Sequence, residues 1–256
     1  MPVNAGAARG STCVARRAGT DVEWRPKARR PVAGPGCKVP DVTAGRALAQ
    51  MALREPMRAI GWQSRAAGWF TRQIAAGFLG VAAVGSASRY SRPGTARITL
   101  YAGIRDEVTE QAVSHLCGLK DEGYRQRTAT TGIGYLLPGS SWREWEVTPG
   151  SADEVARDLA SLVQRYAEPY LHRLSSDHTG LLVAAQRSAA YSQAVGACRV
   201  AVLLARHQGR DQAIAFLRER IDGLGVRTDV AAEAEREMAA RARDWLALPD
   251  PHERQR

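Results

Sequence analysis

The chain has 256 residues, of which 45% are apolar, and its formal net charge is +10. This apolar content excludes a wholly disordered chain and is enough for the core of one large domain or two small ones. The basic excess lies in residues 1–110, because residues 111–256 hold 19 basic and 19 acidic side chains. Of the 36 basic residues 33 are arginine, as a GC-rich genome favours, so we interpret the charge as solvated arginine and do not expect nucleic acid as a partner.

The cysteines argue against a metal site and disulfide bonds, and the apolar runs argue against a membrane-spanning segment. Cys13, Cys37, Cys117 and Cys198 lack the spacing of a metal pair or of a redox C-x-x-C motif. We therefore expect a reducing cytoplasm, no metal and no cofactor. The longest uncharged run, residues 73–88, is short and rich in glycine for a membrane span, so we interpret it as a buried strand, with an interfacial segment as the alternative.

Residues 1–42 are predicted to be a disordered basic tail. They hold five prolines and a basic run at residues 25–30 without a lasting periodicity, so they bury too little surface to offset the entropy of ordering them. An alternative is a misplaced gene start, because the stretch that Met51 opens would make a natural beginning. Residues 249–256 are predicted to be a disordered end.

The first ordered elements are predicted to be a helix and a hairpin. The helix covers residues 43–60 and ends at Gly61, and Pro56 is expected to kink or split it. The hairpin pairs residues 62–65 with residues 68–74. An apolar strand over residues 78–88 and a turn at residues 91–94 follow.

The clearest strand covers residues 96–104, and we expect the fold to be organised around it. It places four apolar residues on one face with a period of two: Ile98, Leu100, Ala102 and Ile104. A helix over residues 106–119 is predicted next, capped by Asp106, with an apolar stripe of Val108, Ala112, Leu116 and Leu119. Further strands are predicted over residues 124–128, 132–137 and 142–147.

The second half of the chain is predicted to be helical. Ser151 and Glu154 form a capping-box pattern, and the helix that follows is expected to break near Pro169 and to continue to Leu174. Four further helices are predicted over residues 177–187, 189–207, 210–221 and 228–246. One helical-hairpin unit is too little to stand alone, so we expect these helices to pack on the preceding domain or on another subunit.

These elements predict an α+β fold with a mainly antiparallel sheet of five to six strands, helices packed on one face, and a C-terminal helical layer. The α+β domain covers residues 43–175, and the C-terminal helices, residues 176–248, pack on it. The alternative is a separate helical domain joined by the polar stretch at residues 175–177.

The sequence IGWQSRAAGWFTR at residues 60–72 resembles the opening of a family of uncharacterised actinobacterial proteins, with a pattern close to G-[FW]-x-x-[KR]-x-x-x-x-F-x-R. The tripeptide at residues 103–105, the GYLLP run at residues 134–138 and Trp142 are similar to the strand positions expected of such relatives. The resemblance covers residues 46–175. The family has no established catalytic residues, so the resemblance implies none here.

The candidate binding residues are aromatic and basic side chains on predicted strands of one small sheet. They are Arg65, Trp69, Arg72, Tyr101, Trp142 and Arg143, with Trp62 and Trp145 nearby in the same strands. If several share a face, they form a concave surface suited to a partner or a ligand. The alternative is that the tryptophans pack under the helices.

The function that we expect is a non-enzymatic binding or protein-interaction module, with a protein partner or a second copy of the chain. No G-x-S-x-G, P-loop, G-x-G-x-x-G or H-E-x-x-H motif is present, and no catalytic residue is assigned. One alternative is an enzyme in which Arg65, Arg72 and Glu144 or Glu146 surround an anionic small molecule, which requires these side chains to converge in one pocket. A weaker alternative is non-specific nucleic-acid binding.

Overall fold

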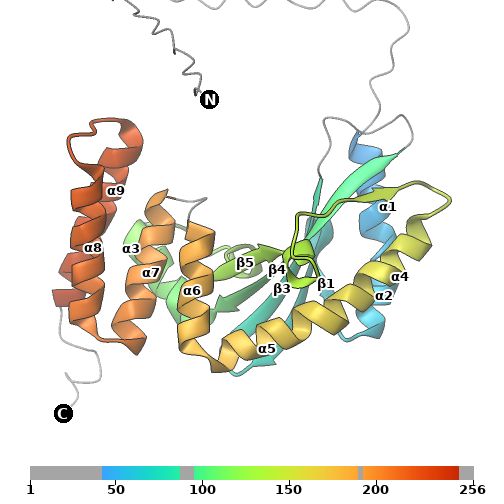
Figure 1. The fold of residues 1–256 in the computed structure, drawn as a ribbon, viewed down its shortest axis with the longest axis horizontal. Helices are drawn as coiled ribbons and strands as arrows, with labels where there is room; N and C mark the ends of the chain where they lie inside the picture. The colour runs from blue at the N-terminus through green and yellow to red at the C-terminus, as the bar shows by residue number, and fades with distance from the viewer. Residues whose placement is uncertain (1–41, 87–94, 190–192, 248–256) are drawn as a thin grey trace, which may run out of the picture. The chain divides into compact units, whose positions relative to one another are not determined.

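The computed structural model describes residues 42–86, 95–189 and 193–247. It contains a six-stranded antiparallel sheet, and the predicted α+β class is confirmed (Figure 1). The strand order is β1 (Gln63–Ser64), β2 (Trp69–Ala75), β3 (Phe78–Ser86), β4 (Ala96–Asp106) and β5 (Ala129–Gly132), and β6 (Trp145–Val147) also pairs with β4. The predicted tail up to residue 41, the turn at residues 91–94 and the end at residues 249–256 lie outside the described residues.

Strand β4 is the centre of the sheet. β3 pairs with it from Asp106 back to Ile98, while β5 and β6 share its other edge, at residues 101–104 and 96–98. The four side chains predicted for the buried face, at positions 98, 100, 102 and 104, are at most 1% exposed. The alternation in the sequence therefore predicted both the strand and its core face.

The long first helix is split, as Pro56 led us to expect. α1 (Val42–Ala52) and α2 (Arg54–Ala59) are separated at Leu53. Pro56 has no N–H to donate to the carbonyl of Ala52, while the backbone hydrogen bonds from Leu53 to Ala49 and from Met57 to Leu53 are kept. Leu53 and Met57 are buried in the main core with Phe70 of β2.

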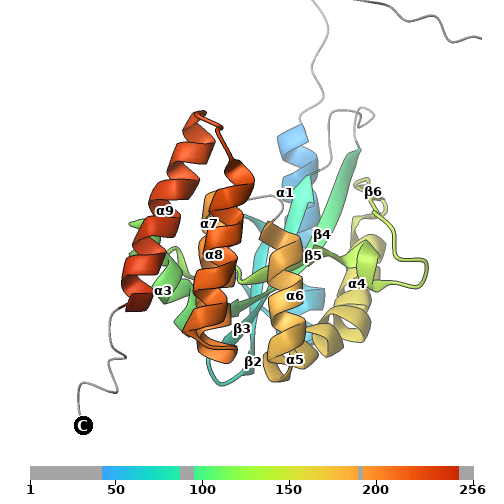
Figure 2. The same ribbon diagram turned by 60° about the vertical axis from the view of Figure 1, so that its left-hand side comes forward.

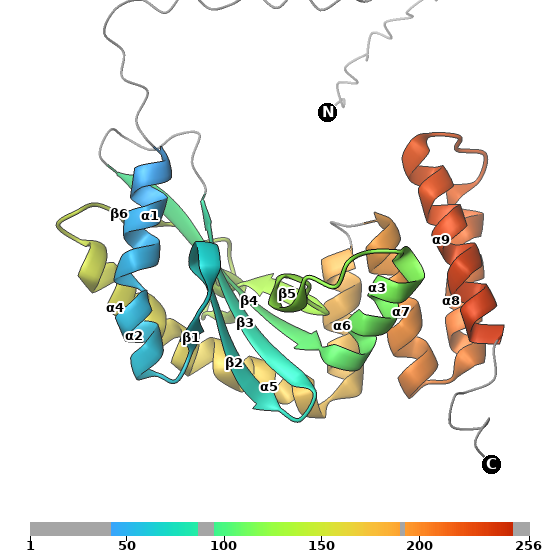
Figure 3. The same cartoon turned by 180° about the vertical axis from the view of Figure 1, so that it is seen from behind.

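A second helical stretch, α4 (Ala152–Leu162) and α5 (Glu168–Ser176), passes along the sheet, with α1 and α2 beside α4 (Figures 1 and 3). At the predicted break near Pro169 there is a π-helical turn, η5 (Val163–Ala167), and Pro169 is the second residue of α5, which follows it. The predicted capping box does not form. The Ser151 hydroxyl pairs with Thr148 instead of capping the helix.

Two of the predicted strands were wrong. Residues 124–128 contain the 3-10 turn η3 (Gly123–Arg125), and residues 133–136 form a second one, η4 (Ile133–Leu136), with β5 between them. In η4 the buried residues Ile133 and Leu137 are four positions apart, while Tyr135 between them is exposed. This spacing fits a helical turn and not the period of two of a strand. An apolar run this short does not distinguish a strand from a tight helical turn.

Helix α3 (Glu107–Cys117) begins where predicted, but the Asp106 side chain makes no capping bond, the helix ends before Leu119, and its buried face differs from the predicted apolar stripe. Val108 and Leu119 are 54% and 45% exposed, whereas Thr109 and Glu110 are fully buried. The reason is a polar partner surface: Glu110 forms an ion pair with Arg199 of α7 (Gln193–His207). The stripe favoured by hydrophobicity was therefore overridden by a buried ion pair.

The C-terminal helices α6 (His178–Ala189), α7, α8 (Arg210–Leu224) and α9 (Val230–Ala247) follow the predicted order (Figure 2). α6 packs on β5, where the Ser188 hydroxyl bonds both the N–H and the carbonyl of Thr130 at 2.9 Å. α7 packs on α3, and α8 and α9 pack on α7. Among the described residues, no helix has the length and apolar character needed to cross a membrane.

Candidate functional site

A groove of about 1030 Å³ lies between two walls that come from distant parts of the chain. β5, η4 and the segment around Trp142 form one wall, and α5 and α6 form the other. Its aromatic and basic lining residues are Tyr101, Arg127, Tyr135, Trp142, Tyr170, Arg173 and Arg187. A concave site with a few converging polar groups is the usual form of a ligand pocket.

The strand register produces a row of side chains in which Tyr101 lines the groove, whereas Trp69 lies outside its lining. Trp69 lies opposite Ala83, Ala83 opposite Tyr101, and Tyr101 opposite Gly132. This row crosses the sheet on the face opposite to the core side chains of β4. The ring of Trp142 lies 6.0 Å from that of Tyr101, so a side chain from outside the core strands completes the row.

Arg127 lies beside this row and brings a positive charge to the groove lining. Its guanidinium lies 4.9 Å from the ring centroid of Trp69, and its Nη1 donates a long hydrogen bond of 3.3 Å to the Thr130 hydroxyl. Burial lowers the pKa of the Arg127 guanidinium, and nearby Tyr101 opposes this shift. Among the described residues, no carboxylate forms an ion pair with Arg127.

The opposite wall carries two more arginines beside a tyrosine. The Arg173 guanidinium lies 5.6 Å from the ring of Tyr170, and burial raises the pKa of that phenol, while Arg173 and Arg187 counter the shift. In the described part of the chain neither arginine has an acidic partner within 4.0 Å. Asp177 also lines the groove, and its carboxylate accepts the N–H of Gly180 at 2.9 Å.

Of the six candidate residues, the structure brings three together. Trp69, Tyr101 and Trp142 share one face of the sheet. Arg65 lies near them, 6.0 Å from the ring of Tyr124, but its guanidinium bonds the Thr71 hydroxyl and it does not line the groove. Arg143 is exposed next to Trp142 and is also outside the lining.

The prediction that Arg72 is a binding residue was wrong. Arg72 is three positions from Trp69 in β2, so its side chain lies on the opposite, core-facing side of the sheet. Its Nη1 bonds Glu168 at 2.6 Å and the Ile60 carbonyl at 2.8 Å. The Trp62 indole donates to the same Glu168 oxygen at 2.8 Å, and Trp62 is 1% exposed. These three side chains join β2 to the start of α5, so Arg72 and Trp62 have a structural role.

The alternative site of Arg65, Arg72 and Glu144 or Glu146 is not assembled. Arg72 is on the opposite face of the sheet from Arg65, and Glu144 accepts the indole N–H of Trp142 and lies 4.0 Å from Arg97. Glu146 pairs across the strands with Arg97 and is exposed. Because alternate residues of a strand point to opposite faces, Arg65 and Arg72 cannot line one pocket.

Replacing Glu168 with alanine is expected to destabilise the protein by about 1–3 kcal/mol, because it leaves the buried indole N–H of Trp62 without an acceptor and the Arg72 charge without its counter-ion. Urea unfolding followed by circular dichroism measures the change. Glu55→Ala is the control, since the exposed pair of Glu55 with Arg58 contributes little. Equal midpoints for the two variants would contradict a structural role for Glu168.

Sequence reasoning missed the residues that come from loops and helices: Arg127, Tyr135, Tyr170, Arg173 and Arg187. The spacing of Tyr170 and Arg173 on one helix face was the one available signal, because residues three apart on a helix are neighbours. Nothing in the sequence places them opposite β5.

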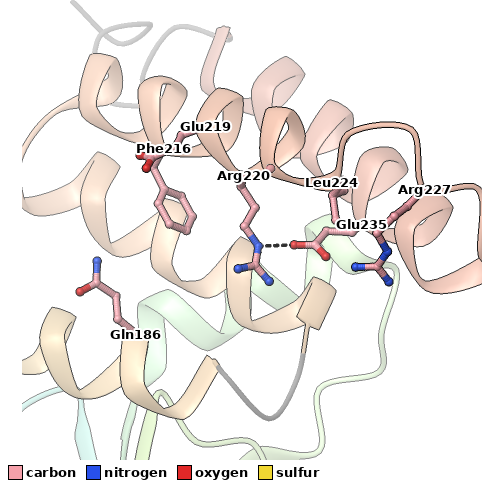
Figure 4. Close-up of a pocket in the computed structure, with 8 residues that line it drawn as sticks. Gln186, Phe216, Glu219, Arg220, Leu224, Arg227 and Glu235 are labelled. Atoms are coloured by element: carbon pink, nitrogen blue, oxygen red, sulfur yellow. Dashed lines mark hydrogen bonds and ion pairs between the residues drawn. The ribbon is translucent and has the colours of Figure 1, made fainter. Parts of the chain in front are cut away.

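A second cavity, of about 520 Å³, lies between α8, α9 and α6 (Figure 4). Phe216 and Gln186 lie on opposite sides of it. Arg220 of α8 forms an ion pair with Glu235 of α9, and Glu235 is 2% exposed. Arg227 pairs with Asp229. Its arginines are thus paired within the protein, unlike those of the groove.

Two histidines outside the groove are stacked. The rings of His178 and His207 lie 3.9 Å apart, and burial lowers the pKa of His207, with His178 adding to the shift. Within residues 42–86, 95–189 and 193–247, no three His, Cys, Asp or Glu side chains gather as a ligand set for a metal.

No family model, no curated protein and no solved structure matches this chain.

Proposed function

We propose that this protein is a binding module that takes up an anionic ligand in the groove between β5 and helices α5 and α6. The observation that carries the proposal is Arg127, a half-buried guanidinium stacked on Trp69 that has no acidic partner among the described residues. Charged side chains removed from water are ordinarily paired. A ligand anion is the partner that would complete this site.

The surrounding charges support the same conclusion. Arg173 and Arg187 line the groove with Arg127, and Asp177 is the one carboxylate among the described lining residues. The groove is therefore positive, and its aromatic walls lower the local dielectric, which strengthens the attraction for an anion.

The lining favours binding over catalysis. The described residues that line the groove include no histidine, cysteine or glutamate, and the Asp177 carboxylate already accepts the N–H of Gly180. General acid–base chemistry uses histidine most often, and the lining groups that could exchange a proton are Asp177 and the tyrosines Tyr101, Tyr135 and Tyr170. We therefore propose a non-enzymatic role for the groove.

Replacing Arg127 with methionine tests the proposal. The change keeps a long side chain over Trp69 but removes the charge, so affinity for inorganic tripolyphosphate, measured by titration calorimetry, should fall by about tenfold or more. The matched control is Arg143→Met, which removes an equal charge from an exposed position outside the lining and should leave affinity within about twofold.

The stability of the free variant separates a ligand-binding role from a structural one. Because the charge of Arg127 is desolvated and unpaired, Arg127→Met should be at least as stable as the natural protein in the absence of anion. Equal affinities in the two arginine variants, or marked destabilisation by Arg127→Met alone, would contradict the proposal.

A further inference from the structure

We infer that the ligand is of the nucleotide class: a planar ring joined to phosphate groups, with the ring against Trp142 and the phosphates among Arg127, Arg173 and Arg187. This inference rests on the proposed function and specifies the chemistry of the same groove.

The ring subsite is built from exposed aromatic surface. Trp142 and Tyr135 are 46% and 48% exposed, and their ring centroids are 6.4 Å apart. Exposed rings that gather at a groove are typical of sites where a partner supplies the missing contacts. A flat ligand ring would gain stacking contacts there.

A hydrogen bond orients the Trp142 ring, which is 46% exposed although the rings of Tyr101 and Tyr135 lie beside it. Its indole N–H donates to Glu144 at 3.1 Å, so the polar edge is already satisfied. Gly132 lies beside both rings, and a Cβ at this position would approach the Tyr135 ring to 3.4 Å and the Trp142 ring to 3.7 Å. The absence of a side chain there keeps space next to the two rings.

The charged subsite indicates several negative charges on the ligand. Among the described residues that line the groove, there are three arginines and the single carboxylate of Asp177. A monocarboxylate would neutralise one of them, whereas a di- or triphosphate carries enough charge to balance several, and guanidinium groups bind phosphate oxygens in a forked geometry. Aromatic side chains beside arginines are also the combination by which proteins hold bases and phosphates together.

Two sources could supply this chemistry, a free nucleotide or a single-stranded nucleic acid, and the test distinguishes them. Titration calorimetry of the full chain would compare ATP, inorganic tripolyphosphate, adenosine and a ten-residue oligothymidylate. We expect ATP to bind about tenfold more tightly than tripolyphosphate, because stacking adds to the same phosphate contacts. Trp142→Ala should remove this difference and leave the affinity for tripolyphosphate unchanged, and Trp142→Phe should restore part of it.

The outcomes are separable from those of the proposed function. If tripolyphosphate binds in an Arg127-dependent manner but ATP binds no better, or if Trp142→Ala leaves the preference for ATP intact, the ring subsite is wrong while the anion site stands. If neither compound depends on Arg127, both proposals fail. Tighter binding of the oligonucleotide than of ATP, again lost in Trp142→Ala, identifies single strands as the source, and weaker binding identifies free nucleotides. A melting curve for each variant establishes that it is folded.

Discussion

Replacing Arg199 with methionine is expected to destabilise the protein by about 3–5 kcal/mol, because it leaves the carboxylate of Glu110 buried without its counter-ion. Arg199 binds both Glu110 oxygens, at 2.6 and 2.9 Å, and the Glu110 side chain is 1% exposed. The hydroxyl of Thr128 donates a further bond at 2.9 Å, which cannot neutralise the charge. Chemical denaturation measures the change in the free energy of unfolding.

Two further variants distinguish the effect of breaking the ion pair from the effect of removing one arginine charge. Arg241→Met removes an exposed arginine that pairs with Glu237 one helical turn away, and should cost about 0.5 kcal/mol or less. The double variant Arg199→Met with Glu110→Leu should recover most of the lost stability, because no buried charge remains unpaired. Equal destabilisation by the single and double variants would show that packing, and not the ion pair, accounts for the effect.

Deleting residues 177–256 is expected to make the remaining chain aggregate instead of leaving an independent α+β domain. The deletion removes Arg199 and Arg206, the partners of Glu110 and Asp106, whose side chains are 1% and 3% exposed. It also uncovers apolar surface that the C-terminal helices bury with Leu181, Val200 and Leu203, each at most 1% exposed. Each such side chain contributes about 1.5–3 kcal/mol, so several together match the whole stability of a typical domain.

Size-exclusion chromatography and thermal melting of the fragment ending at Ser176 provide the measurement. The natural chain, expressed and purified in parallel, is the control. A monomeric fragment with a cooperative melting transition would contradict this prediction and favour a separate helical domain joined at residues 175–177.

The charges of the molecule fall into two groups with different consequences for experiments. Buried arginines that pair with acids, such as Arg105 with Asp121 and Arg199 with Glu110, join secondary-structure elements, so their removal should reduce stability. The arginines of the groove have no such partners in the described part of the chain. Their removal should change ligand affinity before it changes stability, which is the usual trade-off between function and stability.

Much of the backbone architecture could be predicted from the sequence because it depends on local patterns. The alternation in β4 identified the central strand and its core face, and Pro56 identified the split between α1 and α2. Both rest on short-range physics: the period of two in a strand and the missing N–H of proline. The order of the C-terminal helices followed in the same way from glycine stops and apolar periodicity.

Tertiary contacts decided the rest. The polar buried face of α3 exists because Arg199, 89 residues away along the chain, meets Glu110, and the inward position of Arg72 is stabilised by Glu168, 96 residues away. The groove likewise combines β5 and η4 with α5 and α6, so Arg127 and Arg187 line one groove only when α6 packs on β5. Local patterns determine which way a side chain points from its own element, whereas its partner depends on how elements distant in sequence pack together, and this packing determined the groove and its charge.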